Sequence, residues 1–195
     1  MLLPAAILLV IVGLIVLLIW AIRKSKTIEG DTNDAMAALA HELGASYQTG
    51  GKAPLVGTLG GRAVSVIEGA LVSRGESPDY YVKVTVAVHT AVTLELHPQT
   101  SKLGAQMLGD VELGDPDFDK WYLVRTNNPD VVRRAIRSER RPQMVDWVRH
   151  GVIVRLWVRD GLLTCEGGQG LIRRSHVAQT RAVLDVLVEI AAGLE

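Results

Sequence analysis

The first 22 residues, MLLPAAILLVIVGLIVLLIWAI, contain no polar or charged side chain. A helix over this run would be about 33 Å long at about 1.5 Å per residue, and the hydrocarbon core of a bilayer is roughly 30 Å thick. Trp20 lies near the end of the run, where an indole ring favours the membrane interface. We therefore predict a transmembrane helix over residues 1–22, followed by a juxtamembrane tether over residues 23–33.

A cleaved signal peptide is the alternative for such a run. Signal peptides carry positive charge before a shorter apolar stretch and end at a small-residue cleavage site. Here no charge precedes the run, and Arg23, Lys24 and Lys26 follow it. Positive residues beside a span stay on the cytoplasmic side of the membrane. The sequence therefore predicts an uncleaved, single-pass membrane protein whose residues 34–195 form one domain in the cytoplasm.

Residues 80–97 show the clearest strand pattern in the chain. Val82, Val84, Val86 and Val88 alternate with Lys83, Thr85, Ala87 and His89, and Val92, Leu94 and Leu96 continue the apolar parity. Such alternation is typical of strands with one buried face. One strand over the whole run would exceed the usual length of about 3–10 residues. We expect two strands with a break near Thr90, and one long bent strand is the alternative.

Turn signals predict two hairpins. Gly60-Gly61 separates two short strands within residues 54–69, and Asp160-Gly161 separates two strands within residues 152–166. In the second hairpin, Val152, Val154, Leu156 and Val158 are expected to face a core, whereas Ile153, Arg155, Trp157 and Arg159 face outward or a second layer. A further strand is expected at residues 121–125, WYLVR.

Helices are predicted from capping residues and apolar periodicity. The first is capped by Asn33 or Asp34 and ends at Gly44, the second starts at Asn128-Pro129 and continues through the arginine run, and the third opens at Pro142. The last, over residues 176–193 with Ser175 as a candidate cap, is apolar over an arc wide enough to need a sheet beneath it. Short links between strands favour antiparallel pairing. The predicted fold is α+β, mostly antiparallel sheet with helices packed on it.

The stretch LGDPDFDKWYLV, residues 113–124, places Asp115, Asp117 and Asp119 at alternate positions. A calcium loop of the EF-hand type that began at Asp115 would need Gly at position 6 and Glu at position 12. The chain has Lys120 and Thr126 there. We therefore interpret the segment as a structural turn at the solvated start of a strand. Phe118, Trp121 and Leu123 are expected to turn inward from it.

No other motif predicts a catalytic, metal or cofactor site. His89 and His97 share a parity with Glu95 between them, but a zinc site needs three or four ligands. Cys165 is the only cysteine, expected as a packed thiol within a strand. The run GGQG lacks the lysine and hydroxyl residue of a phosphate-binding loop. A hydrolase built from Asp117, Asp119, and His89 or His97 is kept as an alternative function.

The charge of the chain is unevenly divided. The net charge is zero overall, which argues against nucleic-acid binding through bulk charge. Residues 1–119 carry a net charge of −5 and residues 120–195 carry +5. In VVRRAIRSERR, helical spacing would align arginines into one basic stripe for weak contact with anionic lipid. The candidate residues are Arg133, Arg134, Arg137, Arg140 and Arg141.

Several motifs together resemble a family of uncharacterised bacterial proteins with an N-terminal membrane helix and a domain of unknown function. The motifs are the GRAVSV strand, the Gly-Asp-x-x-Phe-Asp stretch at residues 114–119, and the Asn-Pro helix start at residues 128–129, followed by a hairpin and a closing helix. The resemblance covers most of residues 34–195. It implies a bacterial inner-membrane setting and transfers no catalytic residue.

These observations lead to one leading functional hypothesis. We expect a membrane-tethered cytoplasmic domain, non-enzymatic, that binds an unidentified protein partner or assembles a complex. No cofactor, small-molecule ligand or nucleic acid is predicted. A membrane-associated hydrolase and an anionic-lipid binder that uses the arginine helix are the alternatives.

Overall fold

The computed structural model describes residues 33–45, 54–71, 79–99, 110–167 and 177–195, together with Leu17 and Tyr47. Leu17 apart, the predicted span over residues 1–22 lies outside this described part. The tether before Asn33 and the candidate cap Ser175 also lie outside it. No helix of the described part is long and apolar enough to cross a membrane.

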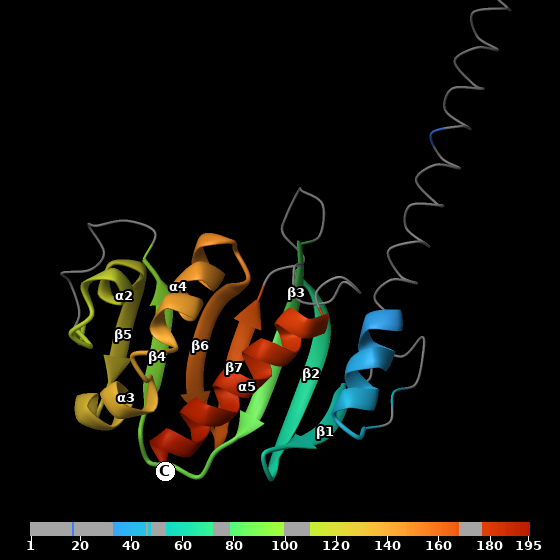
Figure 1. Ribbon diagram of the computed structural model, residues 1–195, viewed down its shortest axis with the longest axis horizontal. Helices are drawn as coiled ribbons and strands as arrows, with labels where there is room; N and C mark the ends of the chain where they lie inside the picture. Colours follow the sequence, from blue (N-terminus) through green and yellow to red (C-terminus); the bar gives the residue numbers. More distant parts are fainter. Residues whose placement is uncertain are drawn as a thin grey trace, which may run out of the picture.

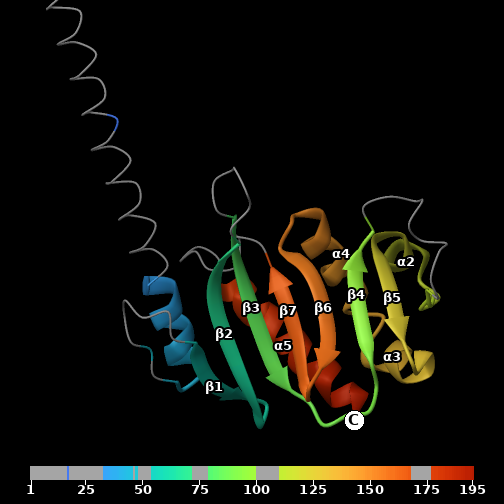
Figure 2. The same ribbon diagram turned by 180° about the vertical axis from the view of Figure 1, so that it is seen from behind.

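Seven described strands form one sheet in the order β1-β2-β3-β7-β6-β4-β5, and every neighbouring pair is antiparallel. Figures 1 and 2 show this sheet from its two sides. The strands are β1 (Leu55–Leu59), β2 (Arg62–Leu71), β3 (Asp79–Ala87), β4 (Leu94–Pro98), β5 (Tyr122–Thr126), β6 (Ile153–Arg159) and β7 (Leu162–Gly167). The predicted α+β class with a mostly antiparallel sheet is confirmed.

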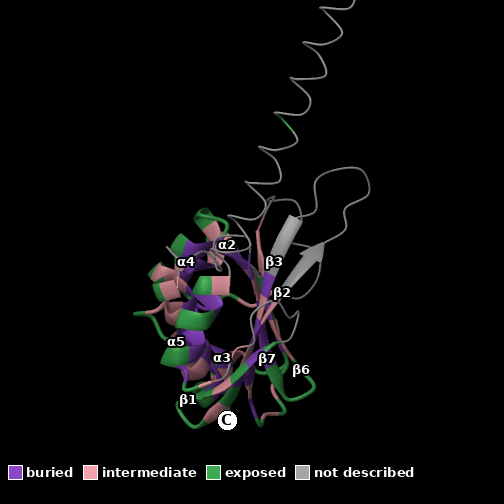
Figure 3. Cartoon of the chain, turned by 90° about the vertical axis from the view of Figure 1, so that its right-hand side faces the viewer, coloured by how far each residue is buried: buried purple, intermediate pink, exposed green. Residues whose placement is uncertain are grey.

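The labelled helices lie together on one face of the sheet, as the edge-on view in Figure 3 shows. They are α2 (Pro116–Trp121), α3 (Pro129–Ala135), α4 (Arg141–Arg149) and α5 (Val177–Leu194). A further helix over residues 33–42 leads to Leu43 and Ala45, which pack over Gly57 of β1 on that same face. Among the described residues, the sheet therefore has one covered face and one face without a helix.

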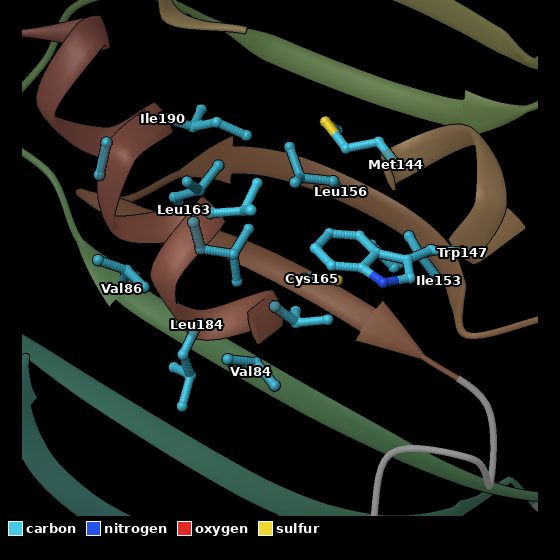
Figure 4. Close-up of a cluster of buried hydrophobic side chains, with 14 of the residues drawn as sticks. Val84, Val86, Met144, Trp147, Ile153, Leu156, Leu163, Cys165, Leu184 and Ile190 are labelled. Carbon is cyan, nitrogen blue, oxygen red and sulfur yellow. The ribbon is translucent and has the colours of Figure 1, made fainter. Parts of the chain in front are cut away.

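The core fills the space between the sheet and α5, as predicted from the apolar arc of the last helix. Val84 and Val86 of β3 and Leu163 of β7 contribute buried side chains from the sheet, and Leu184 and Ile190 do so from α5. Figure 4 shows the same cluster continuing under α4. There it gathers Met144, Trp147, Ile153, Leu156 and Cys165.

Most strand predictions hold. The run over residues 80–97 is two strands, β3 and β4, because the pairing stops at Ala87 and resumes at Leu94. Both predicted hairpins form. Asp160 and Gly161 each have a positive φ, 53° and 74°, as the tight turn between β6 and β7 requires.

Several local predictions are wrong. Ile153 faces the core, because the β6–β7 register shifts between Ile153 and Arg155 and so moves Ile153 to the buried side. The side chain of Val154 lies outside the described part. Asn33 and Asp34 are already helical, so neither is the cap of the first helix.

The third error concerns the arginine run, which is not one helix. α3 ends at Ala135, and α4 begins at Arg141. The helix predicted from Asn128 is therefore too long, because the chain leaves helical geometry at Ile136, whose φ and ψ are −89° and 82°. The helix predicted to open at Pro142 does form, with this proline in the first turn of α4. Asn128 does cap α3 as predicted, since its side chain accepts a hydrogen bond from the amide of Val131.

The close approach of α3 and α5 depends on Gly193. A Cβ atom added to Gly193 would lie 2.7 Å from Cα and 2.9 Å from Cβ of Ala135, and the nearer of these is a backbone atom that cannot move aside. We expect Gly193→Ala to lower the free energy of unfolding by about 1–3 kcal/mol through overpacking, despite alanine's higher helix propensity. Urea unfolding of the detergent-solubilised chain measures this.

Ala192→Gly is the matched control for Gly193→Ala. Ala192 is the exposed neighbour of Gly193 in α5, so the substitution tests helix propensity without a clash. It should cost about 1 kcal/mol or less. A gain in stability from Gly193→Ala would show that the two helices are farther apart than described.

Candidate interaction surface

The uncovered face of the sheet carries the side chains that alternate with the core. We call this surface the open face. Its central part comes from β3, β7 and β6 and consists of Lys83, Thr85, Thr164, Glu166, Arg155, Trp157 and Arg159. Figure 2 views the sheet from this side, with the helices behind it.

The register aligns a row of these residues across the sheet. Thr164 pairs with Thr85 on one side and with Trp157 on the other. Ser65 of β2 continues the row, and its hydroxyl lies 2.6 Å from that of Thr85. Although they belong to the open face, Thr85 and Thr164 are only 8% and 3% exposed. The side chains of this row are therefore tightly packed against one another.

Trp157 lies at the centre of the open face between two cations. The guanidinium carbon of Arg155 is 4.4 Å from the ring centroid, and Nζ of Lys83 is 5.7 Å from it. Arg155 also donates to the carboxylate of Glu166 at 2.8 Å. Cation–π contacts and this ion pair hold the indole in a fixed orientation. A half-buried, oriented tryptophan is a common anchor residue of protein interfaces.

The charge of this central part is positive. Lys83, Arg155 and Arg159 are its cations, and Glu166 is its one carboxylate. Because Arg155 is paired with Glu166, the two remaining cations are not offset within these three strands. Glu95 of β4 is the cross-strand neighbour of Trp157 and adds a second carboxylate on the same face, so the net positive charge around Trp157 is small. A small positive charge favours an acidic partner surface.

A shallow hollow adjoins this region at the ends of β4, β5 and β6. Its polar lining comes from Thr93, Glu95, Arg125, Asn127, Arg159 and Asp160. Two arginines and two carboxylates balance in charge, so the hollow favours neither an anion nor a cation. Asp110 interacts electrostatically with Arg125, and burial raises the pKa of Asp110 while this arginine lowers it.

Two carboxylates of the acidic segment, Asp115 and Asp119, have the structural role expected from the sequence. The Asp119 carboxylate accepts hydrogen bonds from the amides of Leu113, Gly114 and Asp115 at 2.9–3.1 Å. Asp115 caps α2 by accepting from the amide of Phe118. These two carboxylates therefore saturate local backbone donors, which is the usual use of Asp in turns and caps.

The detailed placement within this segment was predicted wrongly. Residues 116–121 form helix α2 rather than a turn followed directly by a strand. Trp121 ends that helix, and the strand starts at Tyr122, so Tyr122 and Val124 face the core in place of Trp121 and Leu123. Only Phe118 of the predicted inward set is buried.

The structure does not bring the candidate hydrolase residues together. His89 follows β3, and its amide donates to Glu195, while Asp117 and Asp119 lie on α2 beside the edge strand β5 (Figure 1). His97 lies on β4, 3.6 Å from Glu95, and β7 and β6 separate β4 from β3. No group of three metal-binding side chains occurs within the described ranges.

Two other ionisable groups serve the fold. Arg62 donates hydrogen bonds from its two terminal guanidinium nitrogens to the Glu195 carboxylate at 2.7 and 2.6 Å, which joins β2 to the end of α5. This pairing lowers the pKa of Glu195 to about 2. Cys165 is fully buried in β7, as predicted for a packed thiol, and burial raises its pKa to about 12. A thiol with that pKa is not a nucleophile near neutral pH.

The five candidate lipid-binding arginines do not form one stripe. Arg140 pairs with Glu189 of α5, Arg133 pairs with Asp130, and Arg141 is only 7% exposed. Arg134 and Arg137 are exposed. Contact of these residues with lipid stays a prediction.

Comparison with known proteins finds a similar fold but shows no family for this chain. No protein-family model matches the chain, and no curated protein matches it. The crystal structure of the mycobacterial trehalose monomycolate transport factor A, TtfA, matches with a TM-score of 0.53 at 16% identity, covering 84% of this chain and 94% of that one. A likeness at this identity shows the shared fold alone. The resemblance to a bacterial membrane-anchored family therefore stays a prediction.

The alternation in the sequence predicted part of the open face. It assigned Arg155, Trp157 and Arg159 to an outward position or a second layer, and the structure leaves this side of β6 without a helix over it. What the sequence could not supply was the neighbourhood of Trp157. Lys83 lies far from Trp157 in the chain and reaches it only because β7 pairs with both β3 and β6.

Proposed function

We propose that this protein is a membrane-tethered, non-enzymatic interaction module that binds an acidic surface of a partner protein through the open face. The observation that carries the proposal is Trp157, held between Arg155 and Lys83 at the centre of a positively charged sheet face that no described helix covers. Residues 1–22 serve as the anchor, and the domain lies in the cytoplasm at a bacterial inner membrane.

The use of the other polar groups supports a binding role over catalysis. Asp115 and Asp119 are engaged with backbone amides, Arg141 with backbone carbonyls, and the Cys165 thiol is buried and protonated. Asp117 lies on α2 beside β5, whereas His89 follows β3, and three strands separate β3 from β5, so the hydrolase alternative has no assembled site in the described part. The fold is shared with a protein described as a transport factor.

The binding proposal predicts that open-face variants lose a partner while the fold persists. We expect Trp157→Ala and Arg159→Glu each to weaken partner retention by about tenfold or more, because a central tryptophan and an unpaired interface cation are typical hot-spot residues. The measurement is quantitative mass spectrometry of proteins that copurify with the full chain from detergent-solubilised membranes. Unfolding by urea is recorded for each variant, so that a loss of fold is recognised.

Arg134→Glu is the matched control for Arg159→Glu. It makes the same charge change at an exposed arginine on α3, in the helical layer. A partner retained by this control and lost by both open-face variants supports the proposal. Recovery of the wild-type chain alone, or equal retention by all variants, would overturn it.

A further inference from the structure

The two edges of the sheet differ in how their backbone groups are used. Figure 2 shows β1 and β5 at the two ends of the sheet. At β5 the amide of Val111 donates to the carbonyl of Val124 at 2.9 Å, so part of that edge is already paired. At the other edge, β1 pairs with β2 and with no other described strand.

The turn between β1 and β2 determines which backbone groups of β1 point outward. Gly60 and Gly61 have φ values of 57° and 77°, as a two-residue hairpin turn of this kind requires. Leu59 and Arg62 flank the turn and face each other in the register. In such a hairpin the flanking residues exchange hydrogen bonds, so their amides and carbonyls point toward each other.

Two residues of β1 therefore have unpaired backbone groups. Because hydrogen-bonded pairs alternate along antiparallel strands, Leu55 and Gly57 also bond to β2. The amides and carbonyls of Val56 and Thr58 point away from β2, and no other residue of the described part forms a hydrogen bond with them. Each residue has one donor and one acceptor, so up to four hydrogen bonds are available to an added strand.

The strand β1 lacks the features that usually keep an edge strand from pairing. Such features are lysines, prolines and bulges. Its sequence LVGTL has no charged residue and no proline, and its register with β2 runs without a shift. Five residues are an ordinary strand length. The side chain of Val56 is 56% exposed. A regular, uncharged and exposed edge is a template for strand addition.

The side chains near this edge indicate which segment would fit. Residues added opposite Val56 and Thr58 would point to the open face, as these two do, and β-branched residues pair well with β-branched neighbours. The open-face residues of β2 are Ala63, Ser65 and Ile67, and none of these five residues is charged. A charged residue in the added segment would find no ionic partner there, so the fitting segment is uncharged.

The small size of the edge favours a segment of a partner over a second copy of this chain. Five residues at about 3.4 Å each give a strip about 17 Å long and one strand wide. Such a strip covers far less than the roughly 800 Å² per partner that stable dimers bury. Short extended segments, in contrast, bind to sheet edges mainly through main-chain hydrogen bonds.

We propose that the outer edge of β1 is a second interaction site, which binds an extended, uncharged segment of a partner protein as an added antiparallel strand. The segment is rich in β-branched residues, and its backbone pairs with Val56 and Thr58. The site is three strands away from Trp157 and does not depend on the binding proposed for the central part of the open face.

The test adds a peptide with blocked ends, STVTVTVS, to the full detergent-solubilised chain and measures amide hydrogen exchange residue by residue. The peptide STPTPTPS has the same length but lacks the alternate amides that pairing needs. We expect STVTVTVS to slow exchange at Val56 and Thr58 by about tenfold, as one new hydrogen bond per amide would. Exchange at Leu55 and Gly57, which already bond to β2, should change little.

The substitution Val56→Pro removes one outward donor and leaves the amides that bond to β2. Proline is tolerated where the amide of an edge strand faces solvent, and we expect about tenfold weaker binding of STVTVTVS. Val56→Ala is the matched control, because it removes the same apolar side chain but keeps the donor. It should weaken binding by about threefold or less. Exchange of the β2 and β3 amides shows whether each variant is folded.

Several results would overturn the proposal. These are no binding of STVTVTVS, equal binding of STPTPTPS, binding without slower exchange at Val56 and Thr58, or equal affinity of a folded Val56→Pro variant and the wild-type chain. Slower exchange at these two amides as the chain alone is concentrated would show that a second copy occupies the edge, and it would overturn the assignment to a partner segment.

Discussion

Replacing Arg141 by methionine is expected to lower the free energy of unfolding by about 3 kcal/mol, because buried carbonyl groups would lose their donor. Arg141 donates to the carbonyls of Ile136, Arg133 and Leu113 at 3.1, 3.3 and 3.5 Å, and its guanidinium lies 3.8 Å from the Asp115 carboxylate. The Arg141 side chain thus provides hydrogen-bond donors for carbonyl groups at the end of α3. It also connects Leu113 and Asp115 to the start of α4. Methionine has a similar volume and no donor.

Arg140→Met is the matched control for this prediction. Arg140 is the preceding residue and forms a two-point ion pair with Glu189, but the side chains are 38% and 33% exposed. Solvent screens such a pair, and its loss should cost about 1 kcal/mol or less. Urea unfolding of the two variants in detergent gives the comparison. Equal, small losses would show that Arg141 is not the donor that α3 requires.

The two adjacent arginines show what sequence reasoning could and could not predict. Arg140 and Arg141 have the same chemistry and stand in the same basic run, yet one is on the surface and the other is buried. Helical spacing grouped them because it assumed one continuous helix. The helix ends instead at Ala135, and the partners of Arg141 at Leu113 and Asp115 come from a segment distant in sequence.

The fold was most predictable where signals are local. The valine alternation of β3, the Asp160-Gly161 turn and the Asn128 cap each depend on a few consecutive residues. The order of the strands was not predictable, because β7 inserts between β3 and β6 through pairings of distant segments. For the same reason the central position of Trp157 in a positive surface could not be derived from the sequence.

Helix α2 is an intermediate case. Six residues are too few for apolar periodicity to reveal a helix. The residues Asp115, Pro116 and Asp117 nevertheless fit a capped helix start, with an acidic cap, proline in the first turn and a further carboxylate near the helix dipole. The interpretation of residues 113–124 as a turn before a strand therefore overlooked a helix start that the residues do indicate.

So short a helix has little stability of its own and depends on the packing of its one buried side chain. We expect Phe118→Ala to lower the free energy of unfolding by about 3–5 kcal/mol, since Phe118 is 0% exposed and its removal leaves a large cavity. Its ring stacks on Tyr122 with centroids 4.7 Å apart, and the Tyr122 hydroxyl donates to the carbonyl of Met144 in α4. The loss should therefore reach both α2 and α4.

The measurements that test Phe118→Ala are urea unfolding and amide hydrogen exchange. Exchange should accelerate in α2 and around Met144 in α4 before it does in β3 or α5, because β3 and α5 lie outside the contact that is lost. Phe118→Leu keeps most of the volume and should cost under about 1.5 kcal/mol. If Phe118→Ala left the exchange of α2 unchanged, the three hydrogen bonds from backbone amides to Asp119 would be sufficient to hold the segment, and the phenyl ring would not be its main support.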